Sequence, residues 1–171
     1  MTGRQLIRCV AYTRQIHCTF LSNGFNFQSL SSSDFFIVLE LNMTRRLCLF
    51  AGYSKQNIIE DYVVYYLKKL SEYADIYYCA DCDMPKEELL KIKPYTKLCL
   101  AQRHKKYDFG SWGILYNKIF NLTDYDELIL ANDSMFGPLY PLENIFKKME
   151  KVNVSTWSLC ANKFMMSFLL S

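Results

Sequence analysis

Three polar side chains, Asn132, Asp133 and Ser134, directly follow an apolar run at residues 128–131. Such a run indicates a buried strand of a parallel sheet, and open α/β sheets bind ligands at the carboxyl ends of their strands. A hard divalent cation takes one or two carboxylates together with phosphate oxygens, so Asp133 could hold a cation and a diphosphate. The alternative is a polar turn, since all three residue types favour turns. The position after the most hydrophobic strand favours the functional interpretation.

Two earlier strand ends also carry candidate binding groups. Gly52 follows an apolar run, and a glycine there allows the backbone to approach a ligand closely. Asp81 follows another run, where an acid can accept hydrogen bonds from a ribose or base, although a structural role fits equally well. For Asp83 we expect a simpler role, namely capping the next helix. The spaced glycines of P-loops and dinucleotide fingerprints are missing from the sequence, so ATP and NAD sites are not indicated.

A basic loop at residues 102–106 holds four potential cations, Arg103 among them, and Tyr107, Asp108 and Gly110 follow it. Cations near a helix N-terminus at a sheet edge can hold a diphosphate. The commoner outcome for such a charge run is a solvated loop, and both interpretations stay open here. Asp108 also begins an Asp-Phe-Gly tripeptide, but the other protein-kinase motifs are not found, so a kinase is not indicated.

Composition restricts the classes of protein to consider. The chain has 171 residues, of which 51% are apolar and 22% charged, which is typical of one globular domain. A net charge of +3 with scattered Lys and Arg gives no reason to expect nucleic acid as a partner. Seven cysteines without framework spacing indicate reduced thiols and a cytoplasmic protein. The apolar stretches are shorter than the roughly 20 residues of a transmembrane helix, so we expect no such span.

The elements that must position these groups alternate along the chain. Strands are expected near residues 47–50, 75–79, 96–100, 127–131 and 154–159. Helices are expected from Asn57, with Glu60 in a capping box, from Pro85, over residues 111–120 and over 142–149. Alternation of this kind predicts an α/β fold with three α/β/α layers and a mostly parallel sheet.

The regular pattern also suggests domain boundaries. Residues 1–42 show little periodicity, and we expect a poorly ordered or spurious N-terminal extension there. The α/β domain is predicted to occupy residues 43–160. Residues 161–171 are interpreted as a truncated tail.

Several motifs together resemble the rhamnan synthesis protein F family. They are residues 47–54, residues 59–70, Tyr-Asp-Phe-Gly-Ser-Trp at 107–112, and Asn-Asp-Ser at 132–134 with Gly-Pro-Leu at 137–139. The resemblance spans about residues 45 to 160. It implies a glycosyltransferase-like protein that uses a nucleotide sugar to build bacterial surface polysaccharides of the rhamnan or O-antigen type.

The order of these parts also resembles the nucleotide-binding half of a GT-A glycosyltransferase. The resemblance implies that Asp81 contacts the base or ribose and that residues 108–112 form a loop beside the donor. It implies that Asp133 holds the diphosphate and a Mg or Mn ion. Asn-Asp-Ser departs from the Asp-x-Asp pattern of that fold, so metal dependence stays open. The complete set expected to bind the donor is Gly52, Asp81, Arg103, Tyr107, Asp108, Gly110, Asn132, Asp133 and Ser134.

The resemblance also implies partners and a location. The donor would be a nucleotide sugar and the acceptor a polysaccharide or a lipid-linked sugar, with peripheral contact at the inner face of the membrane. An acceptor-binding half with the catalytic base would lie beyond residue 160, so we expect weak or absent transferase activity from this chain. The alternative is a non-catalytic scaffold module in a polysaccharide assembly complex. The position of Asp133 distinguishes the donor-binding hypothesis from the scaffold hypothesis. A donor site needs this residue in an open cleft near Asp81 and Gly52, whereas a scaffold would leave it a satisfied turn residue.

Overall fold

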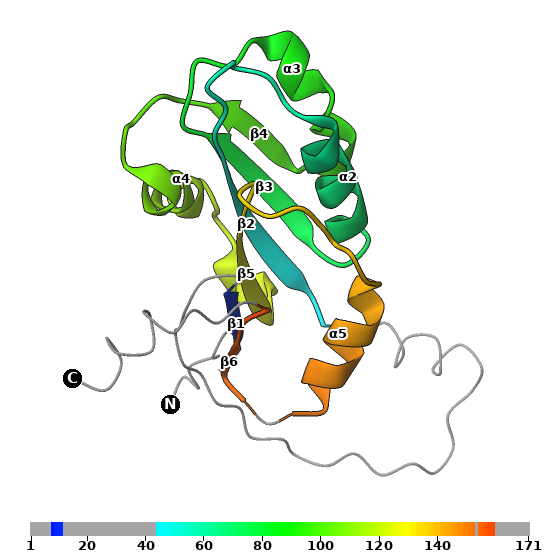
Figure 1. Ribbon diagram of the computed structural model, residues 1–171. Coiled ribbons are helices and arrows are strands. Elements are labelled where there is room, and N and C mark those ends of the chain that lie inside the picture. Colours follow the sequence, from blue (N-terminus) through cyan, green and yellow to red (C-terminus); the bar gives the residue numbers. More distant parts are fainter. Residues whose placement is uncertain (1–7, 12–43, 153, 160–171) are drawn as a thin grey trace, which may run out of the picture.

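The strands of the described residues pair in parallel within one sheet, in the order β4-β3-β2-β5-β1-β6 (Figure 1). The computed structural model describes residues 8–11, 44–152 and 154–159. The strands are β1 (Arg8–Ala11), β2 (Arg46–Gly52), β3 (Asp75–Ala80), β4 (Leu98–Ala101), β5 (Glu127–Asn132) and β6 (Thr156–Trp157). The helices are α2 (Asp61–Leu70), α3 (Lys86–Leu90), α4 (Tyr107–Tyr116) and α5 (Leu142–Glu150), with short 3₁₀ turns η1 (Lys93–Tyr95) and η2 (Leu122–Asp124).

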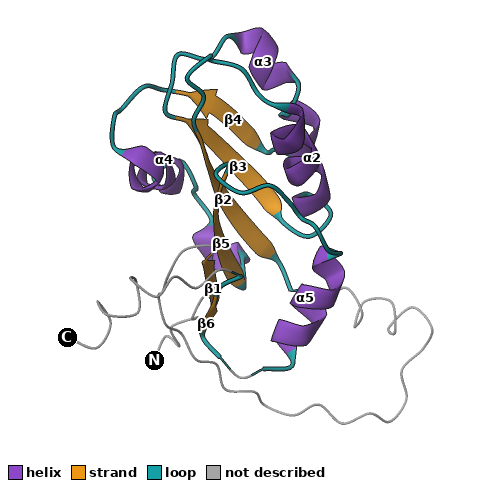
Figure 2. Cartoon of the chain, in the orientation of Figure 1, coloured by secondary structure: helices purple, strands orange, loops and turns teal. Residues whose placement is uncertain are grey.

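Helices cover both faces of this sheet. Helices α2, α3 and α5 lie on one face and α4 lies on the other (Figure 2). The predicted α/β class with three layers and a parallel sheet is therefore confirmed, and each of the five predicted strands overlaps an observed one. The more specific likeness to a GT-A donor-binding half stays a prediction.

The central strand β2 explains why the sheet is stable. All seven of its residues are buried, and alternate side chains enter two separate cores. Leu47 and Leu49 face α4, whereas Cys48 and Phe50 face α2 and α5. The Phe50 ring packs edge-on against Tyr66, with 5.3 Å between ring centroids. Burial on both faces is what a continuous apolar run predicts for a parallel strand.

The order of the strands reverses the direction of the chain at the centre of the sheet. Strand β2 pairs with β3 on one side and with β5 on the other, so the chain changes direction across the sheet between β2 and β5. Loops that leave two such strands separate, and the space between them at the carboxyl edge is where ligands bind in open α/β sheets. The ends of both strands carry residues of the predicted site.

Helix α2 starts later than the capping-box pattern predicted. The helix begins at Asp61, its N-cap is Glu60, and no side chain caps it. Asn57 instead adopts a left-handed backbone with φ of 58°, and its buried Oδ1 has no hydrogen-bond partner among the described residues. The capping prediction was wrong because Asn57 forms a turn before the helix, closed by a bond from its N–H to the Ser54 carbonyl. The helix packs on the sheet through Val63, Tyr66 and Leu70, which are all buried.

Helix α4 starts earlier than predicted, whereas α2 starts later. It spans Tyr107–Tyr116, four residues earlier than the predicted range of 111–120. The apolar and glycine residues of this segment gave no strong start signal. The earlier start brings Asp108 into the first turn of the helix.

A buried ion pair joins the strands at the amino edge of the sheet. The Arg46 Nε donates to Glu127 Oε2 at 2.7 Å, and Arg46 Nη2 donates to Glu150 Oε1 at 2.6 Å. Both Arg46 and Glu127 are almost fully buried, and the guanidinium also lies over the Phe146 ring. This cluster connects β2, β5 and α5 at the edge opposite the predicted site.

The proposed domain limits extend beyond the described residues. Residues 8–11 form β1 between β5 and β6, while the rest of residues 1–42 and residues 161–171 lie outside the described part of the chain. The predictions of an N-terminal extension and a truncated tail therefore stay predictions. Within the described ranges, no helix combines the length and the apolar character needed to cross a membrane.

Candidate functional site

A cleft of about 760 Å³ lies at the carboxyl edge of the sheet, between the ends of β2, β3, β4 and β5. Most of the predicted donor-binding residues line it. From that set the cleft contains Gly52, Asp81, Arg103, Tyr107, Asp108, Asp133 and Ser134, and Tyr53, Tyr62 and Lys105 complete its wall. The other two predicted residues, Gly110 and Asn132, lie behind the wall and hold parts of it in place.

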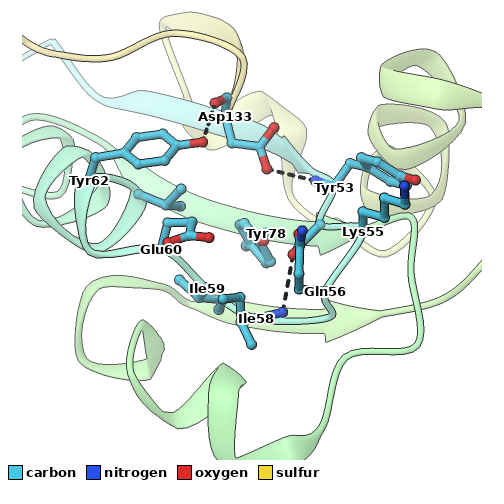
Figure 3. A pocket seen from close by; sticks show the side chains of 11 residues that line it. Tyr53, Lys55, Gln56, Ile58, Ile59, Glu60, Tyr62, Tyr78 and Asp133 are labelled. Atoms are coloured by element: carbon cyan, nitrogen blue, oxygen red, sulfur yellow. Dashed lines mark hydrogen bonds between the residues drawn. The ribbon is translucent and has the colours of Figure 1, made fainter.

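Asp133 joins the two strands where the chain changes direction. Its Oδ2 accepts a hydrogen bond of 2.7 Å from the Tyr53 N–H at the end of β2, and its own N–H donates to the Ala51 carbonyl. Its carbonyl oxygen accepts a bond of 3.0 Å from the Tyr62 hydroxyl on α2 (Figure 3). The residue is therefore held by its backbone and its carboxylate against the end of β2 and against α2, while it still lines the cleft.

The environment of Asp133 disfavours its negative charge. Burial raises the pKa of Asp133 to about 6, the Tyr53 N–H works against this rise, and the charge of Asp108 adds to it. Asp108 is oriented by Asn132, whose Nδ2 donates to Asp108 Oδ2 at 2.8 Å. The negative charges of Asp108 and Asp133 therefore repel each other in the cleft, and a bound cation would reduce this repulsion.

Asp81 organises the basic loop. Its Oδ1 accepts hydrogen bonds from the backbone N–H groups of His104 at 2.7 Å and Lys105 at 2.9 Å. Burial alone would raise the pKa of Asp81, but these donors and the His104 ring outweigh it, so that pKa lies below its usual value. Much of the acceptor capacity that a ribose or base would use is therefore already engaged.

The wrapping of the loop around Asp81 explains its unusual backbone. Lys105 and Tyr107 adopt left-handed conformations with φ of 59° and 54°, on either side of Lys106. Such conformations cost about 1–2 kcal/mol for a residue with a side chain. Alternation of this kind turns successive N–H groups toward one point and forms an anion-binding concavity. Here the anion is the protein's own Asp81 carboxylate, which offsets that cost.

The Tyr-Asp-Phe-Gly-Ser-Trp motif fixes the loop against the sheet. The Nδ1 of His104 accepts a bond from the Lys106 N–H at 3.1 Å, and its Nε2 is hydrogen-bonded to Ser111 Oγ at 3.0 Å. A Cβ on Gly110 would lie 2.5 Å from this ring, so only glycine fits beneath it. The Trp112 Nε1 donates to the Ala131 carbonyl at 3.0 Å and ties α4 to β5.

Asp81, His104 and Ser111 thus follow one another as in a hydrolytic triad, with His104 Nδ1 at 3.4 Å from Asp81 Oδ2. The serine, however, is 1% exposed and lies in the interior beside Cys79. A nucleophile has to reach its substrate, and this hydroxyl does not. The three residues therefore support the loop and do not form a hydrolase site.

Two cations complete the cleft. Arg103 and Lys105 are exposed at its rim, and the Arg103 Nε donates to Asp83 Oδ2 at 2.7 Å. The prediction that Asp83 caps the next helix was wrong, because the N-cap of α3 is Pro85 and no side chain caps it. Asp83 instead restrains Arg103 at the mouth of the cleft.

Gly52 is required for packing as well as for the shape of the cleft. A Cβ at this position would overlap the hydroxyl of Tyr78, which is almost fully buried in β3. Because Gly52 lines the cleft, the prediction that it lets the backbone approach a ligand stays a prediction. The contact with Tyr78 gives a second reason why only glycine fits at this position.

A smaller compartment adjoins the cleft at Asp133 (Figure 3). Its volume is about 160 Å³, and it shares Tyr53, Tyr62 and Asp133 with the cleft. The two tyrosines were not among the predicted site residues. The position of Tyr53 directly after Gly52 was a usable signal, whereas Tyr62 lies on a helix and only the fold brings it to Asp133.

Asp108 and Asp133 together fit a hard divalent cation. Mg²⁺ and Mn²⁺ accept one or two carboxylates when a substrate phosphate supplies further oxygens. Among the described residues, no three His, Cys, Asp or Glu side chains form a group that could hold a metal ion. A cation at this place would therefore take its remaining ligands from a bound diphosphate or from water. The sequence predicted Asp133 as the metal ligand, which stays a prediction, and the fold brings Asp108 into the same cleft.

Comparison with known proteins gives one match. The model of the family described as rhamnan synthesis protein F matches residues 76–168, which is more than half of the chain. The matched segment includes the cleft residues from Asp81 to Ser134. No curated protein and no solved structure matches the chain.

Proposed function

The chain belongs to the rhamnan synthesis protein F family, and on that premise we propose that its cleft binds the nucleotide-sugar donor of a glycosyltransferase reaction. The family associates the chain with rhamnan polysaccharide synthesis. The proposal adds a donor site to this association, with the bacterial surface polysaccharide or a lipid-linked sugar as acceptor.

One observation carries the proposal. Two carboxylates, Asp108 and Asp133, and two cations, Arg103 and Lys105, line a single cleft at the point where the strand order reverses. A diphosphate carries negative charge that cations neutralise, and the carboxylates supply ligands for a divalent ion that bridges to phosphate. A cleft of about 760 Å³ has the size of a small-molecule site.

The same observation weighs against a scaffold. Asp133 would be a self-contained turn residue in a non-catalytic module. Instead it lies in an open cleft with Asp81 and Gly52, and its charge is disfavoured by burial and by Asp108.

Each residue then has a stated task. Arg103 and Lys105 would attract the diphosphate, and Asp81 would keep the basic loop in position to do so. Asp108 and Asp133 would hold the divalent cation, which supplies positive charge against the departing diphosphate. In that reaction the acceptor hydroxyl oxygen would bond to the anomeric carbon while the bond from that carbon to the diphosphate breaks. The hydroxyl proton would pass to a base, expected in the acceptor-binding half, and the nucleoside diphosphate would leave.

We further propose a cytoplasmic location at the inner face of the membrane. Nucleotide sugars and lipid-linked acceptors would meet there. The described cysteines Cys48, Cys79, Cys82 and Cys99 are free thiols, in keeping with a reducing compartment.

A thermal-unfolding screen tests the donor site. The chain is heated with UDP-, GDP-, CMP- and dTDP-sugars, with and without Mg²⁺ or Mn²⁺, and the increase in Tm that each ligand causes is recorded. One nucleotide class should raise Tm, more so with the cation, since a ligand that binds only the folded state stabilises it. The Asp133→Ala variant should lose this increase, whereas Asp124→Asn, an exposed carboxylate away from the cleft, should keep it. A folded protein that responds to none of these ligands would contradict the proposal.

A further inference from the structure

Tyr78 carries a buried hydroxyl that the fold leaves without a partner. The residue lies on β3 and is 1% exposed, and its ring stacks on Phe50 with 5.8 Å between ring centroids. Among the described residues, none forms a hydrogen bond with this hydroxyl. Burial raises the pKa of Tyr78 well above its usual value, so the hydroxyl keeps its proton and can both donate and accept. Because buried polar groups are nearly always hydrogen-bonded, we looked for the place from which a partner could reach it.

That place is the small compartment beside Asp133, which Tyr78 lines (Figure 3). The turn at residues 53–56 and the start of α2 at Glu60 form its other walls. Its volume of about 160 Å³ is roughly ten times the 10–15 Å³ that one water molecule needs. It is also smaller than the roughly 300–1,000 Å³ of a site that holds a whole drug-sized ligand. The compartment therefore fits a single ring.

The charges on the walls favour a neutral ligand. Two carboxylates, Glu60 and Asp133, line the compartment, and Lys55 is the one cation among its lining residues. An anion such as phosphate would be repelled by the two carboxylates. Within the described part of the chain, no three metal-binding side chains come together, so the walls do not form a cation site either.

The hydrogen-bonding groups favour a ring with hydroxyls. The Glu60 carboxylate can only accept, whereas the Gln56 amide and the Tyr78 hydroxyl can donate and accept. No side chain caps α2, so the N–H groups of its first turn are donors too. A pyranose offers several hydroxyls that both donate and accept, whereas a uracil or thymine base presents mostly acceptors. The apolar faces of a pyranose also suit Ile59 and Val63 in the same walls.

We propose that this compartment binds a neutral pyranose ring, one hydroxyl of which forms a hydrogen bond with the Tyr78 hydroxyl. The ring belongs either to the sugar of the donor or to the acceptor, because both present the same chemistry. The compartment and the cleft share Tyr53, Tyr62 and Asp133, so the ring would lie next to a diphosphate in the cleft. In this last respect the inference rests on the proposed function, whereas the evidence from Tyr78 does not need a nucleotide.

Titrations followed by saturation-transfer NMR test the compartment in the full chain. The probes are methyl α-L-rhamnoside and methyl β-D-glucoside, and uridine represents a ligand with a base but no pyranose. At least one glycoside should bind the wild type. Tyr78→Phe should weaken it about three- to tenfold, which is the value of one neutral hydrogen bond. Tyr65→Phe removes an exposed hydroxyl on α2 outside the compartment, and it should leave binding unchanged.

Stability separates a binding role from a packing role. Because the Tyr78 hydroxyl has no partner to lose, ligand-free Tyr78→Phe should resist urea at least as well as the wild type. Gln56→Ala gives a second variant, since Gln56 is exposed in the turn and lines the compartment. It should fold normally and bind the same glycoside more weakly.

Calorimetry with nucleotides identifies the source of the ring. If the ring belongs to the donor, Tyr78→Phe should weaken the nucleotide sugar about three- to tenfold and leave its nucleoside diphosphate unchanged. If the ring belongs to the acceptor, both nucleotides should bind the variant and the wild type equally, and only the glycoside should lose affinity.

Four results would overturn the proposal. They are a wild-type chain that binds neither glycoside, equal glycoside binding by Tyr78→Phe, a ligand-free Tyr78→Phe that is clearly less stable, and uridine binding that requires the Tyr78 hydroxyl. The glycoside titration needs no nucleotide, so the cleft can fail its own screen while the compartment succeeds, and the reverse.

Discussion

Replacing Asp133 by Asn should make the ligand-free protein more stable at neutral pH. The carboxylate is partly buried, it lies in the field of Asp108, and its pKa is about 6 instead of the ordinary 3.8. The Asn side chain keeps an oxygen that can accept the hydrogen bond from the Tyr53 N–H, now 2.7 Å long, while the charge disappears. The substitution thus removes an unfavourable charge and preserves the contact that joins β2 to β5.

The magnitude follows from the pKa. Each tenfold change in acidity is worth about 1.4 kcal/mol, so a change from 3.8 to about 6 corresponds to an upper limit of about 3 kcal/mol. Because the carboxylate retains contact with solvent, we expect about 1–2 kcal/mol.

The pH dependence gives the sign. At pH values below 3.8 the carboxyl is protonated in both the folded and the unfolded chain, and it contributes nothing. As the pH rises from 3.8 to about 6, the unfolded chain ionises first and the folded state loses stability relative to it. The advantage of Asp133→Asn should therefore grow over this window and stay constant at higher pH.

Urea unfolding at about pH 4 and about pH 7.5 measures the effect, with Asp124→Asn as the exposed control. The free energy of unfolding of Asp133→Asn should exceed that of the wild type at the higher pH, and the gap should close at the lower pH. A gap that does not depend on pH, or a variant that is less stable at neutral pH, would refute the reasoning about this carboxylate.

Three further substitutions test the supports of the cleft, each by denaturant unfolding. Gly52→Ala should cost about 1–3 kcal/mol because its Cβ would overlap both the hydroxyl and the ring of Tyr78. Tyr78→Phe removes only the hydroxyl, so adding it should recover a small part of the loss; a Gly52→Ala variant as stable as the wild type would contradict the overlap. Asp81→Ala should lower the free energy of unfolding by about 1–3 kcal/mol at neutral pH and speed amide exchange in the basic loop. The loss of stability should become smaller as the pH falls through the lowered pKa of Asp81. Unchanged amide exchange would contradict the conclusion that Asp81 holds this loop. Arg46→Met should lower the free energy of unfolding by about 3–5 kcal/mol, because the buried Glu127 carboxylate loses the guanidinium that it binds. The double variant Arg46→Met/Glu127→Met should recover most of this stability. Equal losses in the two variants would show that the buried charge of Glu127 does not cause the destabilisation.

The sequence was sufficient for the order of the elements and for the edge of the sheet at which the cleft lies. Continuous apolar runs and alternating helix patterns are local signals, and they predicted the parallel sheet. Asp133 was found for the same reason, since the position after a buried strand in an α/β fold is set by topology. Seven of the nine predicted residues line one cleft because they all follow strands at that edge.

The interactions between loops were beyond a sequence pattern. Asp83 was expected to cap a helix, yet it binds Arg103, which lies 20 residues away in the chain. Asp81 holds the basic loop through backbone N–H groups whose direction depends on left-handed residues. The start of α4 was misplaced because its first turn is fixed by contacts such as Asn132 with Asp108 and not by a capping residue.

The central claim is that Asp108 and Asp133 hold a divalent cation together with a nucleoside diphosphate. Calorimetric titration tests it most directly, with the nucleoside diphosphates UDP, GDP and dTDP added to the chain in the presence and absence of Mn²⁺. We expect that one nucleotide binds, that Mn²⁺ strengthens its binding, and that Asp108→Asn/Asp133→Asn removes the effect of Mn²⁺ while the protein stays folded. Equal binding by the wild type and this variant, or no heat of binding from any nucleotide, would contradict it.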